Sequence, residues 1–137
     1  MAGVLLLLLL GCREREGPLS AAHSGPRPDV MPVVTNQSLP FRYPTALYAQ
    51  KVQGNVTLRL YIGADGRVIP ESTRVVETSG HTALDSAAVR GSEDLAFVPA
   101  KRRGEPMPVS LLFPVYFRHP DAEPLPGDSV VAPAESP

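Results

Sequence analysis

The chain has 137 residues, a length that accommodates one small domain and not two. Its 13 basic and 14 acidic side chains leave a net charge of −1, which argues against a surface that attracts nucleic acid through its phosphates. The 16 prolines are too many for a uniformly folded chain and gather towards its ends, so we expect the folded part to lie between two proline-rich segments.

The first element is an apolar run, MAGVLLLLLLG, that stops at Cys12, the only cysteine. A membrane-spanning helix needs about 20 apolar residues, and a run as short as this one is typical of a signal peptide. The four residues ending at Cys12 resemble the bacterial lipobox, in which the cysteine is lipidated and becomes the new N-terminus. We therefore predict a signal peptide over residues 1–11 and a lipid anchor on Cys12. This anchor would hold the protein on the periplasmic face of a membrane. An Asp directly after the lipidated cysteine is associated with retention in the inner membrane, and Arg13 at that position favours the outer membrane.

A second interpretation of this run stays open. No Lys or Arg precedes it, although signal peptides usually begin with positive charge. The run then represents part of a longer transmembrane helix, shortened by a start codon that was assigned too late.

The next segment, residues 12–39, is poor in aromatic residues and rich in Pro, Ser and charge. Such a composition buries too little apolar surface to offset the entropy lost on ordering. It predicts a flexible tether with a span of about 30 Å. Residues 119–137 have the same composition and are predicted to be a disordered tail, which leaves residues 40–118 as the folded domain.

Inside the domain, Pro44 in the first turn favours a short helix over residues 43–50. Residues 54–62, GNVTLRLYI, alternate apolar and polar side chains, which predicts a strand with one buried face. The GADG sequence at 63–66 supplies the Gly and Asp of a hairpin turn.

A second strand follows in two pieces, 67–69 and 73–77, interrupted by Pro70. Residues 82–95 carry apolar residues at steps of three and four, which indicates a helix. The last strand is predicted over 109–117. The order of these elements indicates an α+β fold, in which helices pack on a small antiparallel three-stranded sheet.

Proline positions predict the strand order. A proline cannot donate a hydrogen bond to a neighbouring strand, so it is confined to sheet edges, strand starts and bulges. Strand 54–62 has no proline and is placed in the centre, whereas Pro70 and Pro114 place the other two strands outside. The strand over 109–117 then has one open side.

A set of short motifs is spread in order over this core. The motifs are a Tyr-Pro followed by Ala, a Gln-Gly-x-Val, an Asp-Gly hairpin, a Ser-Gly, a Leu-Asp-x-Ala-Ala helix, a Phe-x-Pro-Ala and a closing Pro-Val-x-Phe. They fall on Tyr43, Pro44, Ala46, Gln53, Gly54, Val56, Asp65, Gly66, Ser79, Gly80, Leu84, Asp85, Ala87, Ala88, Phe97, Pro99, Ala100, Pro114, Val115 and Phe117. This ordered set resembles the C-terminal domain of TonB-type proteins.

The resemblance implies a binding module. TonB-like domains capture a short segment of outer-membrane transporters by adding it as a strand, a mode in which main-chain bonds supply affinity. By resemblance, the receiving edge is the last strand, at Ser110, Leu111, Leu112, Phe113, Val115 and Tyr116. Pro114 removes one donor from this edge, and protection of the edge from aggregation is an equally weighted interpretation.

No residue pattern indicates catalysis. His23, His81 and His119 have no Cys or carboxylate at ligand spacing, so neither a metal nor another cofactor is expected. Ser79 lacks a G-x-S-x-G context, and we expect neither an enzyme nor a small-molecule substrate. The basic run Lys101, Arg102 and Arg103 is interpreted as a solvated hairpin tip, with contact to an acidic partner as the alternative.

Three hypotheses about function remain. The first is a lipid-anchored periplasmic module that binds a transporter or another envelope protein by strand addition. The second is an energy transducer whose spanning helix was lost to a wrong start codon. The third is a structural envelope lipoprotein that keeps the fold and no longer binds a peptide. The short tether favours the first over the second, because a transducer must cross the periplasm.

Overall fold

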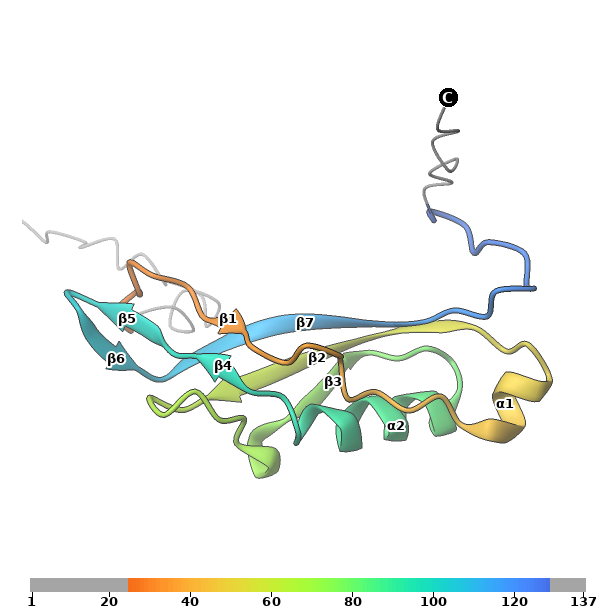
Figure 1. Ribbon diagram of the computed structural model, residues 1–137, viewed down its shortest axis with the longest axis horizontal. Coiled ribbons are helices and arrows are strands. Elements are labelled where there is room, and N and C mark those ends of the chain that lie inside the picture. Colours follow the sequence, from red (N-terminus) through yellow and green to blue (C-terminus); the bar gives the residue numbers. More distant parts are fainter. Residues whose placement is uncertain (1–24, 129–137) are drawn as a thin grey trace, which may run out of the picture.

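The computed structural model describes residues 25–128 of the protein, which form one elongated domain (Figure 1). Its main elements are, in chain order, α1 (Thr45–Ala49), β2 (Gly54–Ile62), β3 (Arg74–Glu77), α2 (Thr82–Ser92) and β7 (Val109–Phe117). Four short strands, β1 (Val33–Val34), β4 (Phe97–Val98), β5 (Ala100–Arg102) and β6 (Glu105–Met107), and a 3-10 turn, η2 (Pro70–Ser72), complete it. No helix between residues 25 and 128 is both long and apolar enough to cross a membrane.

The central sheet has three antiparallel strands in the order β3-β2-β7. The prediction that residues 54–62 form the middle strand is confirmed. β2 pairs with β7 along its whole length, from Gly54 opposite Phe117 to Ile62 opposite Val109. Both prolines lie where a missing donor is tolerated, because Pro70 begins η2 and Pro114 lies in the outer strand β7.

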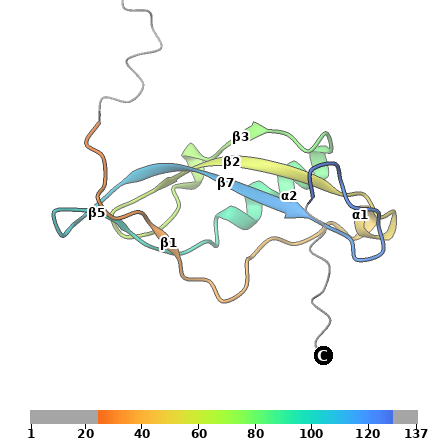
Figure 2. The ribbon, with the colours of Figure 1, turned by 90° about the horizontal axis from the view of Figure 1, so that it is seen from above.

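Helix α2 covers one face of this sheet and leaves the opposite face open (Figures 1 and 2). Alternation along β2 explains this arrangement, since every second side chain points at the helix. The core contains fully buried Leu58, Leu60 and Ile62 from β2 and Leu84 from α2. The predicted α+β fold is therefore confirmed in its main elements.

Two glycines allow close approach of segments that are distant in sequence. At Gly66, which ends the turn after β2 with φ +80°, an added Cβ would lie 2.0 Å from the Phe97 carbonyl oxygen. At Gly91 in α2, an added Cβ would lie 2.6 Å from Phe41 Cδ1 and 2.9 Å from the Pro40 carbonyl oxygen. The absence of a side chain at Gly91 thus allows the segment before α1 to pack against the helix.

The predicted tether is wrong for the part of residues 12–39 that the structure describes. β1 pairs with β4, and the backbone N–H groups of Asp29 and Val30 both donate to the Lys101 carbonyl, at 2.9 and 3.1 Å. Thr35 also donates its N–H to the Ala96 carbonyl at 2.9 Å. Main-chain bonds, which composition does not reveal, hold this segment on the domain.

The prediction of a disordered tail over residues 119–137 is also wrong for residues 119–128, the part that the structure describes. His119 is buried, and its backbone N–H donates to Gln53 Oε1 at 3.0 Å. Asp128 forms an ion pair with Arg118 at 2.7 Å. Residues 119–128 therefore fold back onto the domain, and we call them the strap.

Candidate functional site

The outer edge of β7 is identified by the direction of the backbone groups in β2. Ile69 N–H donates to the Tyr61 carbonyl at 2.8 Å, so the backbone of Tyr61 faces the β3 side of the sheet. Successive residues of a strand point their N–H and C=O groups alternately to its two sides, so these groups of Leu60 and Ile62 face β7. Their partners Leu111 and Val109 in turn face β2.

This alternation divides the predicted edge residues into two groups. Leu111, Phe113 and Val115 direct their backbone groups at β2, whereas Ser110, Leu112 and Tyr116 direct theirs outward, together with Pro114. Pro114 therefore costs the sheet no ladder bond. Between residues 25 and 128, no other segment pairs its backbone with this outer side of β7, so its groups are available to an added strand.

A groove lies beside the second half of this edge. The segment before α1 runs along the side of β7 away from β2 (Figure 2). Its side chains Leu39, Phe41 and Tyr43 and residues 114–118 line a hollow of about 300 Å³. The Phe41 ring also contacts Phe113, with ring centroids 5.9 Å apart, which fixes this wall against β7.

The open face next to the edge is partly apolar. Leu112 and Tyr116 are 57% and 62% exposed, and both point to the face that α2 leaves uncovered. They stand opposite Arg59 and Asn55 of β2. An added strand would thus find both main-chain donors and apolar contact area here.

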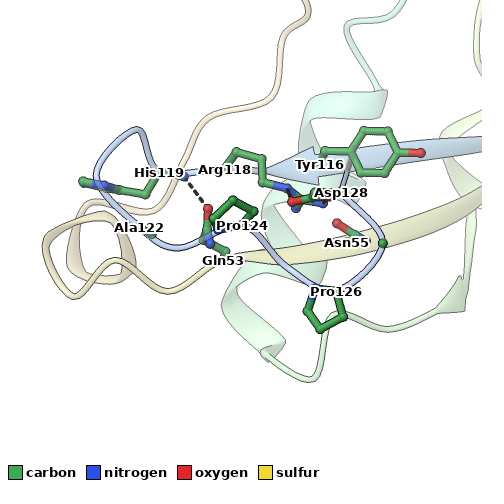
Figure 3. Close-up of a pocket in the computed structure, with 10 residues that line it drawn as sticks. Gln53, Asn55, Tyr116, Arg118, His119, Ala122, Pro124, Pro126 and Asp128 are labelled. Atoms are coloured by element: carbon green, nitrogen blue, oxygen red, sulfur yellow. Dashed lines mark hydrogen bonds and ion pairs between the residues drawn. The ribbon is translucent and has the colours of Figure 1, made fainter. Parts of the chain in front are cut away.

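The strap builds a second hollow, at the end of β7 (Figure 3). It has a volume of about 800 Å³, and its walls come from the strap and from Gln53, Asn55, Tyr116 and Arg118. Arg118 and Asp128 were missed at the sequence level, because the tail composition predicted disorder. Their opposite charges were the only available signal.

The basic run predicted as a hairpin tip lies at the β5–β6 turn, at one end of the molecule (Figure 1). Arg103 has φ +53° and Gly104 φ +80°, a two-residue turn of the kind that joins tight hairpins. Arg103 N–H donates to Asp29 Oδ2 at 2.8 Å. In the described chain, none of the side chains of Lys101, Arg102 and Arg103 forms an ion pair. They lie far along the sheet from the groove.

Cys12, the predicted lipidation site, lies outside the described residues, as does His23. Of the other two histidines, His81 is the N-cap residue of α2 without a side-chain capping bond, and His119 packs on Tyr48 with ring centroids 4.3 Å apart. Within residues 25–128, no group of three His, Cys, Asp or Glu side chains is positioned to hold a metal ion.

Asp85 organises the loop that leads into α2. Its carboxylate accepts hydrogen bonds from Ser79 N–H at 2.9 Å, from Ser79 Oγ at 2.7 Å and from the Thr78 hydroxyl. Burial raises the pKa of Asp85, but these hydrogen bonds favour the charged form more strongly, so the net pKa lies below its usual value.

Protonation of Asp85 in acid is therefore expected to lower the free energy of unfolding. A lowered carboxyl pKa contributes stability above the unfolded-state value of about 3.9, and this is lost as the pH falls through the folded-state pKa. The variant Asp85→Asn should lose about 1 kcal/mol at pH 7. Its stability should also change less than that of the wild type between pH 5 and pH 3. Urea unfolding at both pH values measures this, and equal acid sensitivity of the two proteins would contradict it.

The antiparallel sheet covered on one face by a helix, with an outer strand β7 that has no further backbone partner within residues 25–128, is the α+β architecture of TonB C-terminal domains. Residues 40–119 match the model of the C-terminal domain of Gram-negative bacterial TonB proteins, and the chain belongs to this family. The sequence-based identification is thereby confirmed. The family is related to transport and is not an enzyme family.

Three known proteins illustrate the relationship. The curated protein tonB2 of Pseudomonas aeruginosa is 40% identical over 60 residues, which cover 44% of this chain and 22% of that protein's length. The solution structure of the P. aeruginosa TonB C-terminal domain matches 67% of this chain and 90% of its own, with a TM-score of 0.56 at 18% identity. The Helicobacter pylori domain, residues 194–285, matches 57% of this chain and 79% of its own, with a TM-score of 0.46 at 26% identity.

Proposed function

We propose that this protein is a TonB-like binding module of the bacterial cell envelope that adds a peptide segment of a partner protein to β7. The observation that carries the proposal is the outer edge of β7, where Ser110, Leu112 and Tyr116 direct backbone groups away from the sheet. The groove beside Phe41 and Tyr43 gives alternate side chains of the added strand a place to pack. The family membership supports a transporter as the partner.

We further propose a lipid anchor on Cys12 as the means of attachment to a membrane, on the outer membrane in preference to the inner. The support is the lipobox-like sequence that ends at Cys12. Mass spectrometry of the purified protein's N-terminus is the test, with a diacylated or triacylated Cys12 as the expected result. An unmodified Cys12 inside a longer N-terminal sequence would instead favour the energy transducer.

The test of strand addition uses one position and two substitutions. Leu112→Pro removes an outward N–H that β2 does not use, and Leu112→Ala removes the side chain and keeps the N–H. Titration with synthetic peptides from transporter N-termini should show saturable binding to the wild type. We expect a loss of about tenfold in Leu112→Pro and a smaller loss in Leu112→Ala, because one main-chain hydrogen bond contributes up to about 1.5 kcal/mol.

The control measurement is amide exchange of the same complexes. Bound peptide should slow exchange of the Ser110, Leu112 and Tyr116 amides in the wild type. Absence of saturable binding together with absence of this protection would reject strand addition and leave the structural lipoprotein as the better account. Equal affinities of the two Leu112 variants would show that the side chain, not the backbone, is recognised.

A further inference from the structure

The guanidinium of Arg118 is occupied by a carboxylate of the same chain. Arg118 Nη2 lies 2.7 Å from Asp128 Oδ1, and Arg118 Nε lies 2.8 Å from Oδ2. This is the two-bond geometry in which arginine recognises carboxylates. Each of the two side chains is 28% exposed, and Figure 3 shows the pair beside Tyr116.

Arg118 is held in this orientation by the sheet itself. Its Nη1 donates to the Gly54 carbonyl at 3.3 Å and to the Phe117 carbonyl at 3.2 Å. Neither bond involves the strap. The guanidinium therefore keeps the Nε–Nη2 side available for a carboxylate whether or not Asp128 is in place.

Arg118 also lies where an added strand would reach it. It directly follows β7 and continues the alternation that places Tyr116 on the open face. The guanidinium carbon lies 5.4 Å from the centre of the Tyr116 ring, which confirms that the two side chains are neighbours. A strand paired with the outer edge of β7 would have side chains next to Tyr116 and Arg118 on this face.

We infer that Arg118 is a carboxylate-binding subsite of the β7 edge, which Asp128 fills in the absence of a partner. The partner peptide then carries an Asp or Glu at the position beside Arg118, and this carboxylate displaces Asp128. The inference rests on the proposed function, because the peptide reaches Arg118 by pairing with β7.

Asp128 can leave Arg118 while the first part of the strap stays bound to the domain. Its first residue is fixed, because His119 N–H donates to Gln53 Oε1 and the His119 ring packs on Tyr48. Gln53 Nε2 also donates to the Glu123 carbonyl at 2.7 Å. Beyond that point, the bonds of the described strap are those that Asp128 accepts from Arg118 and Leu125 and the Asp128 N–H to the Leu125 carbonyl. Exchange of one carboxylate for another therefore frees only the last residues.

The experiment uses the full chain and two capped hexapeptides of alternating Val and Thr that differ by an Asp or an Asn at one end. Each is also made with this residue at the other end, so that either strand direction is sampled. Of the two Asp peptides, the one that binds more tightly should also bind the wild type more tightly than the Asn peptide with the same end substituted. Asp128→Asn, which removes the internal competitor, should tighten the Asp peptide about two- to fivefold and leave the Asn peptide unchanged.

Arg118→Gln provides the complementary variant. It should bind the Asp and Asn peptides equally, and its affinity for the Asn peptide should equal that of the wild type, which shows that the edge is intact. The advantage of the Asp peptide should shrink as salt is raised. If the peptides bind but Asp and Asn are equivalent in both the wild type and Asp128→Asn, the subsite is rejected and strand addition stands. If no peptide binds any variant, strand addition fails and the subsite with it.

Discussion

Gly66→Ala is expected to lower the free energy of unfolding by about 3 kcal/mol or more, measured by urea denaturation. Two costs add at this position. A φ of +80° is unfavourable for any residue with a Cβ, at about 1–2 kcal/mol. The new Cβ would also lie 2.0 Å from the Phe97 carbonyl oxygen, so the backbone must move. The displaced Phe97 accounts for the second cost, because its N–H donates to the Gly66 carbonyl.

Gly80→Ala separates these two costs. Gly80 has a similar φ of +82°, but an added Cβ meets no atom within 4 Å. We expect this variant to lose only about 1–2 kcal/mol, the cost of the backbone conformation. Equal losses in the two variants would show that contact with Phe97 contributes nothing and that the turn after β2 rearranges freely.

Leu58→Ala is expected to cost about 2–5 kcal/mol, because it leaves a cavity in the centre of the core. Leu58 is fully buried on the face of β2 that α2 covers, and it stands opposite Phe113 of β7. The loss therefore weakens the strand that supports the candidate binding edge. Urea unfolding followed by circular dichroism measures the change.

The matched control is Arg59→Ala, one residue along the same strand. Arg59 points to the open face, and its replacement should change the free energy of unfolding by no more than about 0.5 kcal/mol. A large effect at Arg59, or a small one at Leu58, would place the core on the wrong face of the sheet.

The regular elements were predictable because the spacing of their apolar side chains shows which face of the element is buried. The alternation in residues 54–62 marks one buried face of β2, and the spacing of apolar residues over 82–95 marks α2, which ends at Ser92. Proline placement predicted the strand order, because every backbone N–H of a central strand faces a neighbouring strand and a proline has no N–H to donate.

The segments on either side of the domain were not predictable in the same way. β1 and β4 have two residues each, too few to show a period. Residues 29–36 are held by main-chain bonds, which any sequence can form, and by side-chain bonds of Asp29, Thr35 and Asn36 to distant backbone groups. The Arg118–Asp128 contact joins a strand end to a proline-rich tail, and neither residue type is unusual there.

The sequence predicted the strand that forms the candidate site, but not which of its backbone N–H and C=O groups point outward. Period-two alternation shows that residues 109–117 form β7, but it does not show which backbones face the neighbouring strand. That assignment needed the bond from Ile69 to Tyr61, two strands away from the edge. Of the six predicted edge residues, only Ser110, Leu112 and Tyr116 direct their backbone N–H groups outward.

The pairing of residues 29–36 with the region around Lys101 has a mechanical consequence. Tension applied to the chain on its N-terminal side acts first on the bonds of Asp29, Val30 and Thr35, before any load reaches β2. Peeling residues 29–43 off the domain would release about 50 Å of extended chain. It would also withdraw Phe41 and Tyr43 from beside β7, so a pull on this segment would remove one wall of the groove.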